Sequence, residues 1–363
     1  MSLRMLGTAL SATLLAAAAN APAQSNTDAP FGTWDKTVPM EAPKGWKAPH
    51  TAWGDPDLRG NWPIDYLGQT PRTRPPQFGT RAVLTDEEYK SALNSAEAQL
   101  DRYAQEDKVG KMGMGHWTER GLPLRQTSLM TYPLDGRLPD ATPEGQKLAA
   151  AGKSSWTEEV FNWTDDFNLY DRCITRGMPG SMLPGAYNSG IEVWQAPGVV
   201  AIKLEMIHET RMVWLDGRAA PPPEVQYWLG FSRGHWEGNS LVIETTNFKP
   251  GSSLGNSDNT RKPVPNSDRM KVMERLTPTG PNTIQYEAWV DDPEMLTGPF
   301  KYDFPWRRNT DYVQYEYACH EGNEQFRGYI EGRSTNPRLV AKRDAAVEAR
   351  DSGHPVEIHP ATQ

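Results

Sequence analysis

The chain has 363 residues, and its 38 basic and 46 acidic side chains give a net charge of -8. Because the two signs are well mixed, the composition argues against a nucleic-acid surface or an anionic membrane as partner and favours a small-molecule or glycan ligand. Beyond the first residues, no window approaches the ~20 apolar residues of a transmembrane helix, so no membrane-spanning segment is expected.

Residues 1–23 have the pattern of a secretory signal peptide. Arg4 supplies a positive charge, an apolar run extends from Met5 to Ala19, and Ala21-Pro22-Ala23 offers a small-x-small cleavage site. The pattern predicts export to the periplasm or the extracellular space, with a mature chain that begins near Gln24. Since no cysteine follows the apolar run, we expect the chain to be released rather than lipid-anchored.

The two cysteines, Cys173 and Cys319, are expected to form one disulfide because an exported chain meets oxidising conditions. In the chain-entropy model such a long closed loop stabilises the fold by about 4–5 kcal/mol. A nucleophilic or metal-binding thiol is the less favoured alternative, since such thiols are rare where oxidation is easy.

The N-terminal part of the mature chain divides into two segments. Residues 24–84 are rich in Pro, Gly and isolated Trp, which indicates an extended arm and a first strand. Residues 85–165 read as a helix and loop insertion. Thr85 and Glu88 form a capping box, which predicts a helix over 85–105, and the remainder of the insertion is expected to be mostly loop. The apolar positions of this helix recur at helical spacing: Tyr89, Leu93, Ala96, Leu100 and Tyr103.

Residues 166–334 are predicted to form an antiparallel β domain. Alternating and apolar runs separated by turn residues predict strands at 191–195, 199–213, 240–248, 270–276, 283–291 and 312–319. Such a meander must hide its edges, so we expect it to close as a barrel or to fold into a sandwich, and we favour the barrel. Residues 335–363 should form a peripheral helix near 339–350 and a flexible tail.

Common catalytic motifs are missing from the sequence. It contains no Gly-x-Ser-x-Gly elbow and no phosphate-binding glycine loop, and no second histidine follows His208-Glu209 at zinc-helix spacing. This argues against the common serine hydrolases, nucleotide-dependent enzymes and ordinary metalloproteases. We therefore expect neither a cofactor nor a metal site, although His208, His320 and nearby carboxylates could together supply the three ligands of a zinc or calcium site.

The densest mixture of titratable and apolar residues lies on the predicted strand 199–213. Strict alternation would place one set on one face, Lys203, Glu205, Glu209 and Arg211, and another on the opposite face, Leu204, Met206, His208 and Met212. In a sheet that is buried on one side, the charged face would be exposed to solvent and the apolar face would be core. In a barrel with a water-filled interior, the charged face could instead point inward. A β-bulge would also bring His208 and Arg211 together.

Four residues are the catalytic candidates. His208 would shuttle protons, because histidine titrates near neutral pH, and Arg211 would hold an anionic group of a substrate or intermediate. Glu205 or Glu274 would be the second acid-base group. For a histidine such as His208 a structural role is the more frequent one, and a structural ion pair is the favoured interpretation of Glu274 beside Arg275.

The binding candidates are His320 and Glu316, from the run near Cys319, and Trp214. A structural role is the more frequent one for a histidine such as His320 as well, and His235 is expected at a turn with a structural role. The 13 tryptophans and 13 tyrosines offer flat apolar faces with polar edges, which suit sugars or aromatic compounds.

Several stretches resemble a widespread family of exported bacterial proteins that usually carry no assigned function. They are DPDLRGNW (55–62), YDRCITRGMPGSMLPGAYN (170–188), EMIHETRMVWLDGR (205–218), GFSRGHWEGNSLVIETTNF (230–248) and YEYACHEGN (315–323). The resemblance covers most of the mature chain and implies no reaction or catalytic residue. Gly60-Asn61-Trp62 also resembles the Gly-x-Trp of lipocalin-type barrels, where it closes one end of the barrel, although here the helix and loop insertion precedes the clear strands.

These observations favour an exported, cofactor-independent enzyme, a lyase, isomerase or hydrolase, acting by general acid-base chemistry on a small aromatic or sugar-like molecule in a β-sheet pocket. The alternative is a non-catalytic periplasmic binding protein for an apolar or glycan ligand. An envelope-assembly protein with an exposed apolar patch is a third possibility. Convergent titratable groups in one pocket would favour the enzyme, and a purely aromatic pocket would favour the binding protein.

Overall fold

The computed structural model describes residues 31–34, 38–111, 121–157, 160–252, 263–321 and 323–351. The predicted signal peptide and the predicted start near Gln24 lie outside these residues. Within the described ranges, no helix has both the length and the apolar character needed to cross a membrane.

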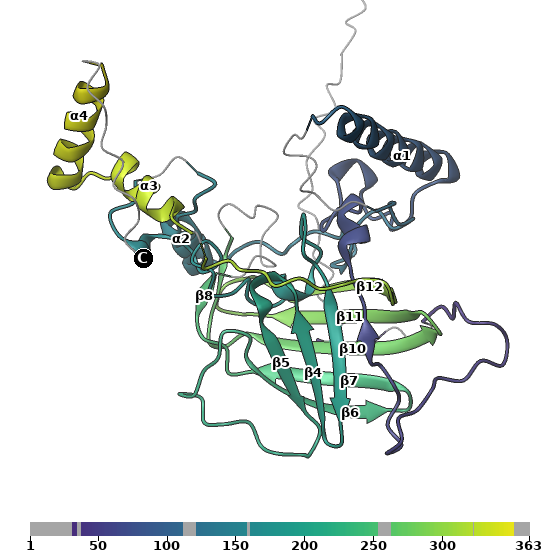
Figure 1. The fold of residues 1–363 in the computed structure, drawn as a ribbon. Helices are drawn as coiled ribbons and strands as arrows, with labels where there is room; N and C mark the ends of the chain where they lie inside the picture. The colour runs from purple at the N-terminus through teal and green to yellow at the C-terminus, as the bar shows by residue number, and fades with distance from the viewer. Residues whose placement is uncertain are drawn as a thin grey trace, which may run out of the picture.

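The fold is built on one ten-stranded sheet that curls into a half-barrel (Figure 1). Its order is β1-β3-β4-β5-β6-β7-β10-β11-β12-β2, and every neighbouring pair is antiparallel except β5 and β6, which are parallel. The strands are β1 (Gly60–Asn61), β2 (Met130–Tyr132), β3 (Ile191–Ala196), β4 (Val199–Leu204), β5 (Thr210–Trp214), β6 (Phe231–Glu237), β7 (Ser240–Thr246), β10 (Lys271–Gly280), β11 (Thr283–Asp291) and β12 (Phe300–Arg307). A separate pair joins β8 (Gly251–Ser252) to β9 (Pro265–Asn266).

The mainly β character of the chain is confirmed, but the closed barrel is not formed. The sheet has two free edges, β1 and β2, which come from the predicted arm and from the predicted insertion. Both segments thus contribute strands to the main sheet, because β1 pairs with β3 and β2 pairs with β12. The one parallel pair also departs from a simple antiparallel meander.

Alternation along the strands places the core on one face of the curled sheet. In β4, Val200, Ile202 and Leu204 are buried, while the residues between them are only half-buried. Large aromatic side chains from later strands, including Tyr286 and Trp306, are fully buried in the same cluster. Their removal from water supplies the main stabilisation of the sheet.

The predicted strand 199–213 is in fact two strands, β4 and β5, joined by a tight turn. A short 3-10 segment covers Met206–His208, with left-handed φ values of 61° at Ile207 and 44° at His208. The turn reverses the chain, so that Ile202 pairs with Arg211. The predicted grouping of charges is therefore wrong: Arg211 points into the interior, whereas Met212 is exposed.

Other strand predictions have mixed outcomes. The strands near 191–195, 240–248, 270–276 and 283–291 are confirmed, but 312–319 forms no strand and runs as irregular chain across the top of the sheet (Figure 1). The long strands β6 and β12 were not predicted, because Gly234, charged residues and Pro305 interrupt their alternation, and neither were the short strands β2, β8 and β9. His235 accordingly lies within β6 and not at a turn.

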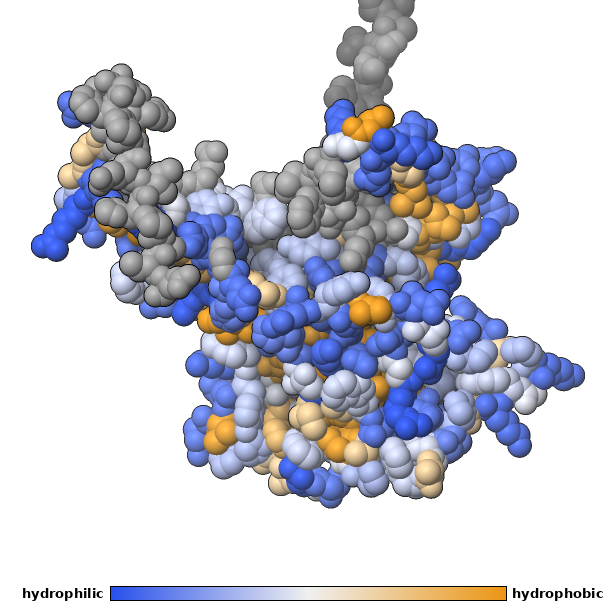
Figure 2. All heavy atoms as spheres, viewed as in Figure 1, coloured by the Kyte–Doolittle hydropathy of each residue, from blue (hydrophilic) through white to orange (hydrophobic). Residues whose placement is uncertain are grey.

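Four α-helices surround the upper side of the sheet: α1 (Asp86–Lys108), α2 (Pro143–Ala151), α3 (Gln325–Arg333) and α4 (Pro337–Asp351). The capping box of α1 is confirmed, because Thr85 Oγ1 accepts from Glu88 N–H and the Glu88 carboxylate accepts from Thr85 N–H. The peripheral C-terminal helix corresponds to α4, whereas α2 and α3 were not predicted. Helix α1 lies on one side of the molecule, and α3 and α4 project on the other (Figure 1). The surface seen from the same direction is largely hydrophilic (Figure 2).

Short 3-10 segments complete the secondary structure. They are Asp65–Gln69, Pro76–Phe78, Thr164–Asp166, Gly180–Met182 and Met206–His208. The last two lie in the segments that build the candidate site.

Candidate functional site

Two predicted catalytic residues, Arg211 and Glu274, form a closed ion pair inside the sheet. The guanidinium nitrogens Nη1 and Nη2 donate to the two carboxylate oxygens at 2.9 and 2.6 Å, and both side chains are almost completely buried. Tyr286 donates to the same carboxylate at 2.9 Å. Ser232 and Thr245 accept from Arg211 at 3.2 Å. Glu274 thus pairs with Arg211. The ion pair that had been predicted was with its neighbour Arg275.

The surroundings of this pair keep the Arg211 guanidinium charged and the Tyr286 hydroxyl protonated. Burial opposes the charge of Arg211, but the attraction of Glu274 outweighs it, so the pKa of the guanidinium is raised. Burial and the Glu274 charge raise the pKa of Tyr286 well above its ordinary value, which keeps its hydroxyl as a donor. Neither Arg211 nor Glu274 lines the main cleft described below.

The predicted residue Glu205 anchors a C-terminal segment, residues 308–321, which we call the strap. The buried Glu205 carboxylate accepts from the Tyr312 hydroxyl at 2.5 Å and from the Tyr315 N–H at 3.3 Å, both on the strap. It also accepts from Asn188 and from Gly190 N–H, at 3.2 and 3.1 Å. A Cβ at Gly190 would lie 2.6 Å from Glu205 Oε2, so only glycine permits this approach.

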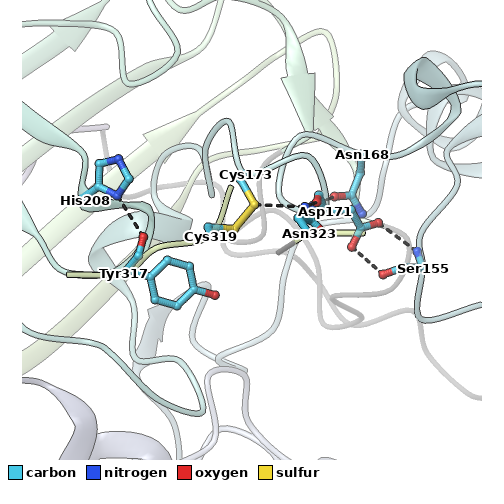
Figure 3. The surroundings of a disulfide bond; sticks show 8 residues. All are labelled: Ser155, Asn168, Asp171, Cys173, His208, Tyr317, Cys319 and Asn323. Carbon is cyan, nitrogen blue, oxygen red and sulfur yellow. Dashed lines mark hydrogen bonds between the residues drawn. A yellow bond between two sulfur atoms is a disulfide. The ribbon is translucent and has the colours of Figure 1, made fainter. Parts of the chain in front are cut away.

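His208 contacts the strap a few residues further along. Its exposed ring lies with Nδ1 3.0 Å from the carbonyl oxygen of Tyr317, which can only accept, so Nδ1 carries the proton. In Figure 3 the Tyr317 ring points away from His208 and toward the cysteine pair. Glu205 and His208, both on the turn after β4, therefore position the strap.

The predicted disulfide is present between Cys173 and Cys319, whose Cα atoms are 5.7 Å apart and 146 residues apart in sequence. It joins the strap to the loop that precedes β3 (Figure 3). Asn323 Nδ2 donates to the Cys173 sulfur and to the Asp171 carbonyl, each at 3.3 Å. The strap is thus fixed by Glu205, by His208 and by a covalent bond.

A cleft of about 640 Å³ lies between the strap, the loop before β3 and the start of α3. This volume is within the ~300–1,000 Å³ range of small-molecule sites. Its walls are aromatic and polar, and both cysteines contribute. The lining residues are Ser155, Trp156, Tyr170, Asp171, Cys173, Tyr187, Asn188, Glu316, Tyr317, Ala318, Cys319, Glu321, Asn323, Gln325 and Tyr329.

Three tyrosines of the cleft, Tyr170, Tyr187 and Tyr317, hydrogen-bond with one another through their hydroxyl groups. The rings of Tyr187 and Tyr317 stack with centroids 6.4 Å apart. Burial and the nearby phenol oxygens raise the pKa of Tyr170 to about 12 and also raise the pKa of Tyr317. The phenols of Tyr170 and Tyr317 therefore stay protonated at neutral pH and can donate to a ligand oxygen.

A buried arginine, Arg176, lies close enough to all three tyrosines for its charge to interact with them. Burial, with the charge of Arg72, lowers the pKa of Arg176 to about 10, so it remains a cation at neutral pH. Its Nη1 reaches the Leu183 carbonyl only at 3.4 Å, and its buried Nε has no partner within the described ranges.

The Glu209 carboxyl has a pKa near neutral pH and lies beside Arg176, although Glu209 does not itself line the cleft. Burial raises its pKa to about 7, although hydrogen bonds from Thr175 and from the main chain of Arg176, together with the Arg176 charge, favour ionisation. Thr175 Oγ1 donates to Glu209 Oε2 at 2.8 Å. Because Glu209 follows His208 on the turn, one short segment supplies a strap anchor and a titrating carboxyl.

The remaining predicted binding residues are dispersed. Glu316 lines the cleft, while His320 is exposed and does not line it. Trp214 is half-buried on β5, with the Arg218 guanidinium 3.7 Å above its ring, and also does not line the cleft. Among the residues that the structure describes, no group of three or more His, Cys, Asp or Glu is placed to hold a metal ion.

Sequence reasoning did not single out Arg176 or the tyrosine group, and it considered Glu209 only as part of a charged face. The available signal was their position: Tyr170 and Arg176 flank Cys173, and Tyr317 precedes Cys319 by two residues. A disulfide predicted between these cysteines brings their neighbours together.

Comparisons with known proteins give no match. No family model matches the chain, and neither the curated proteins nor the solved structures contain a significant relative.

Proposed function

We propose that the protein is an exported enzyme that transfers protons to and from a small molecule in the cleft, without a cofactor. The observation that carries the proposal is a cluster along and behind the cleft wall, in which Arg176 interacts both with the Glu209 carboxyl, whose pKa is near 7, and with the three mutually bonded phenols that line the cleft. A group that titrates near the working pH is the most effective general acid or base.

The roles follow from the chemistry of each group. Glu209 does not line the cleft, so it would take a proton from the substrate or return it by way of the phenols that do. The protonated phenols of Tyr170 and Tyr317 would donate hydrogen bonds to an oxygen that gains negative charge. Arg176 would stabilise that charge from behind the phenols in a site of low dielectric constant. Such a set suits a lyase, an isomerase or a hydrolase. Arg211 and Glu274 would instead stabilise the sheet, and Glu205 and His208 would hold Tyr317 in place.

Two further features support this proposal. A disulfide within the cleft suits a protein of an oxidising compartment, as export would require. Three of the stretches that resemble the exported bacterial family, 170–188, 205–218 and 315–323, supply most of the cleft and the turn beside it. We propose that members of this family share the cleft.

The test is a product screen. Mature, disulfide-bonded protein is incubated with a panel of neutral and acidic sugars, lactones and phenolic compounds, and products are identified by mass spectrometry. For any compound converted, kcat/KM should change through pH 7 in the parent, and Glu209→Gln should remove this dependence without lowering the melting temperature. Tyr317→Phe should lower kcat. Full turnover in both variants would refute the assignment.

The second candidate is a binding protein that shelters a ligand without converting it. The observation that favours it is the wall of the cleft, where aromatic rings and amides outnumber groups that can transfer protons. Under this alternative, a compound would bind in the cleft, Trp156→Ala would weaken it, and no product would form.

A further inference from the structure

We infer that the ligand of the cleft is an uncharged saccharide. This inference rests on the proposed function, because it names the class of ligand that binds in the same cleft. The argument comes from the charge of the lining side chains, from the placement of the aromatic rings and from the polar groups between them.

The charge of the lining disfavours anionic ligands. Three carboxyl side chains border the cleft, Asp171, Glu316 and Glu321, and no lysine, arginine or histidine appears among its described lining residues. Arg176 lies behind the tyrosines and does not itself line the cleft. A uronate, sulfate or phosphate ester would therefore bring its charge toward carboxylates without a direct cationic partner.

The aromatic rings provide flat faces at the opening. Trp156 is 60% exposed although it lines the cleft, so much of its indole is available to a ligand. Tyr329, on α3, lines the same cleft and packs against Phe161 and Phe167, with ring centroids 5.8 and 6.0 Å apart. A packed ring holds its orientation, as a stacking platform for a pyranose ring must.

Polar side chains lie between these rings. Asn188, Gln325 and Ser155 line the cleft together with the carboxylates of Glu316 and Glu321. Ser155 is held by Asp171, which accepts from its hydroxyl at 2.7 Å and from its N–H at 2.9 Å (Figure 3). Amides and carboxylates can both bond the hydroxyl groups at the edge of a sugar. An apolar aromatic ligand would leave them unpaired, because the only aliphatic side chain in the lining is Ala318.

The experiment measures binding independently of turnover. Calorimetric titrations use the full mature protein with its disulfide intact and the probes maltotriose, cellotriose, xylotriose, trigalacturonate and vanillyl alcohol. At least one neutral trisaccharide should bind, and Trp156→Ala should weaken it about tenfold, the change expected when one ring face is no longer buried. Trp194→Ala is the matched control, because Trp194 is 54% exposed on β3 and does not line the cleft, and it should bind as the parent does.

A double variant tests whether the lining carboxylates disfavour anionic ligands. Glu316→Gln combined with Glu321→Gln should raise the affinity for trigalacturonate relative to that for the neutral trisaccharide, because it removes the repulsion of a carboxylate ligand but keeps side chains that can bond hydroxyl groups. Both side chains are exposed, so this variant should fold as the parent does. The inference is overturned if trigalacturonate or vanillyl alcohol binds more tightly than every neutral trisaccharide, if none of the neutral trisaccharides binds, or if Trp156→Ala and Trp194→Ala have equal effects.

Failure of this inference is distinguishable from failure of the proposed function. A neutral saccharide that binds through Trp156 without product would sustain the ligand class and refute the enzyme. Turnover of a phenolic or anionic compound that depends on Glu209, with no saccharide bound, would refute the ligand class and sustain the enzyme.

Discussion

Removing the negative charge of Glu274 should destabilise the sheet strongly. Glu274→Gln leaves the Arg211 guanidinium buried without a counter-ion, although Ser232 and Thr245 still accept from it. Breaking a buried ion pair on one side costs about 3–5 kcal/mol. We expect a loss of this size in the free energy of unfolding. It can be measured by denaturation in guanidinium chloride, followed by far-UV circular dichroism at pH 7 with the disulfide intact.

A matched control exists on the adjoining strands. Arg233 and Glu244 form a similar pair at 2.7 Å between β6 and β7, but their side chains are 34% and 47% exposed. Because solvent screens this pair, Glu244→Gln should cost no more than about 1 kcal/mol. The two variants differ mainly in burial, so the difference between them measures what an uncompensated charge costs inside the sheet.

The double variant Arg211→Met with Glu274→Leu completes the test. It removes both charges and fills the space with apolar side chains, so its stability should lie within about 2 kcal/mol of the parent and above that of either single variant. If Glu274→Gln unfolds at the same guanidinium concentration as Glu244→Gln, or if the single losses simply add in the double variant, the structural role that we give the pair is wrong.

Three further predictions concern the cleft and its strap. The pKa of Glu209 is about 7 in the folded chain and 4.5 in the unfolded chain, so the stability from its proton is present below pH 4.5 and lost as pH rises through 7. Relative to the parent, Glu209→Gln should therefore gain about 3 kcal/mol of unfolding free energy between pH 4 and 8, and an unchanged difference across that range would contradict the pKa. Replacing Cys173 and Cys319 together by serine should lower the unfolding free energy by about 4–5 kcal/mol and increase amide exchange in the strap more than in β10 and β11, whereas uniform exchange would argue against a local role. Tyr312→Phe removes the hydroxyl that donates to Glu205, so it should lower the free energy of unfolding by about 1–3 kcal/mol and speed amide exchange at strap residues. Unchanged exchange would show that this hydrogen bond does not hold the strap.

Much of the sheet could be predicted because its strands carry local signals. The alternation in Ser240–Thr246 and Thr283–Asp291 and the capping box at Thr85 depend on neighbouring residues alone, and all three predictions are confirmed. The disulfide needed only the cysteine count and the expected compartment.

The turn after β4 could not be predicted from local pattern. Ile207 and His208 adopt left-handed φ values, although the sequence there continues the apolar and polar mixture of a strand and contains no Gly, Pro or Asn. Long-range contacts from Glu205 to Tyr312 and from His208 to Tyr317 hold this conformation, and a β-branched residue adopts such φ values only where the surroundings enforce them. The predicted charged face depended on an unbroken strand. Because the turn breaks that strand, the prediction placed Arg211 on the wrong face.

The position of the disulfide relative to the strands has a consequence for how the cleft comes into being. Cys173 precedes β3 and Cys319 follows β12, so all the strands from β3 to β12 lie inside the covalent ring that the bond closes. The two cysteines reach their native separation only when both ends of this stretch of chain lie side by side. Because both cysteines also line the cleft, the shape of the cleft and the native pairing of the cysteines depend on the same meeting of the two ends.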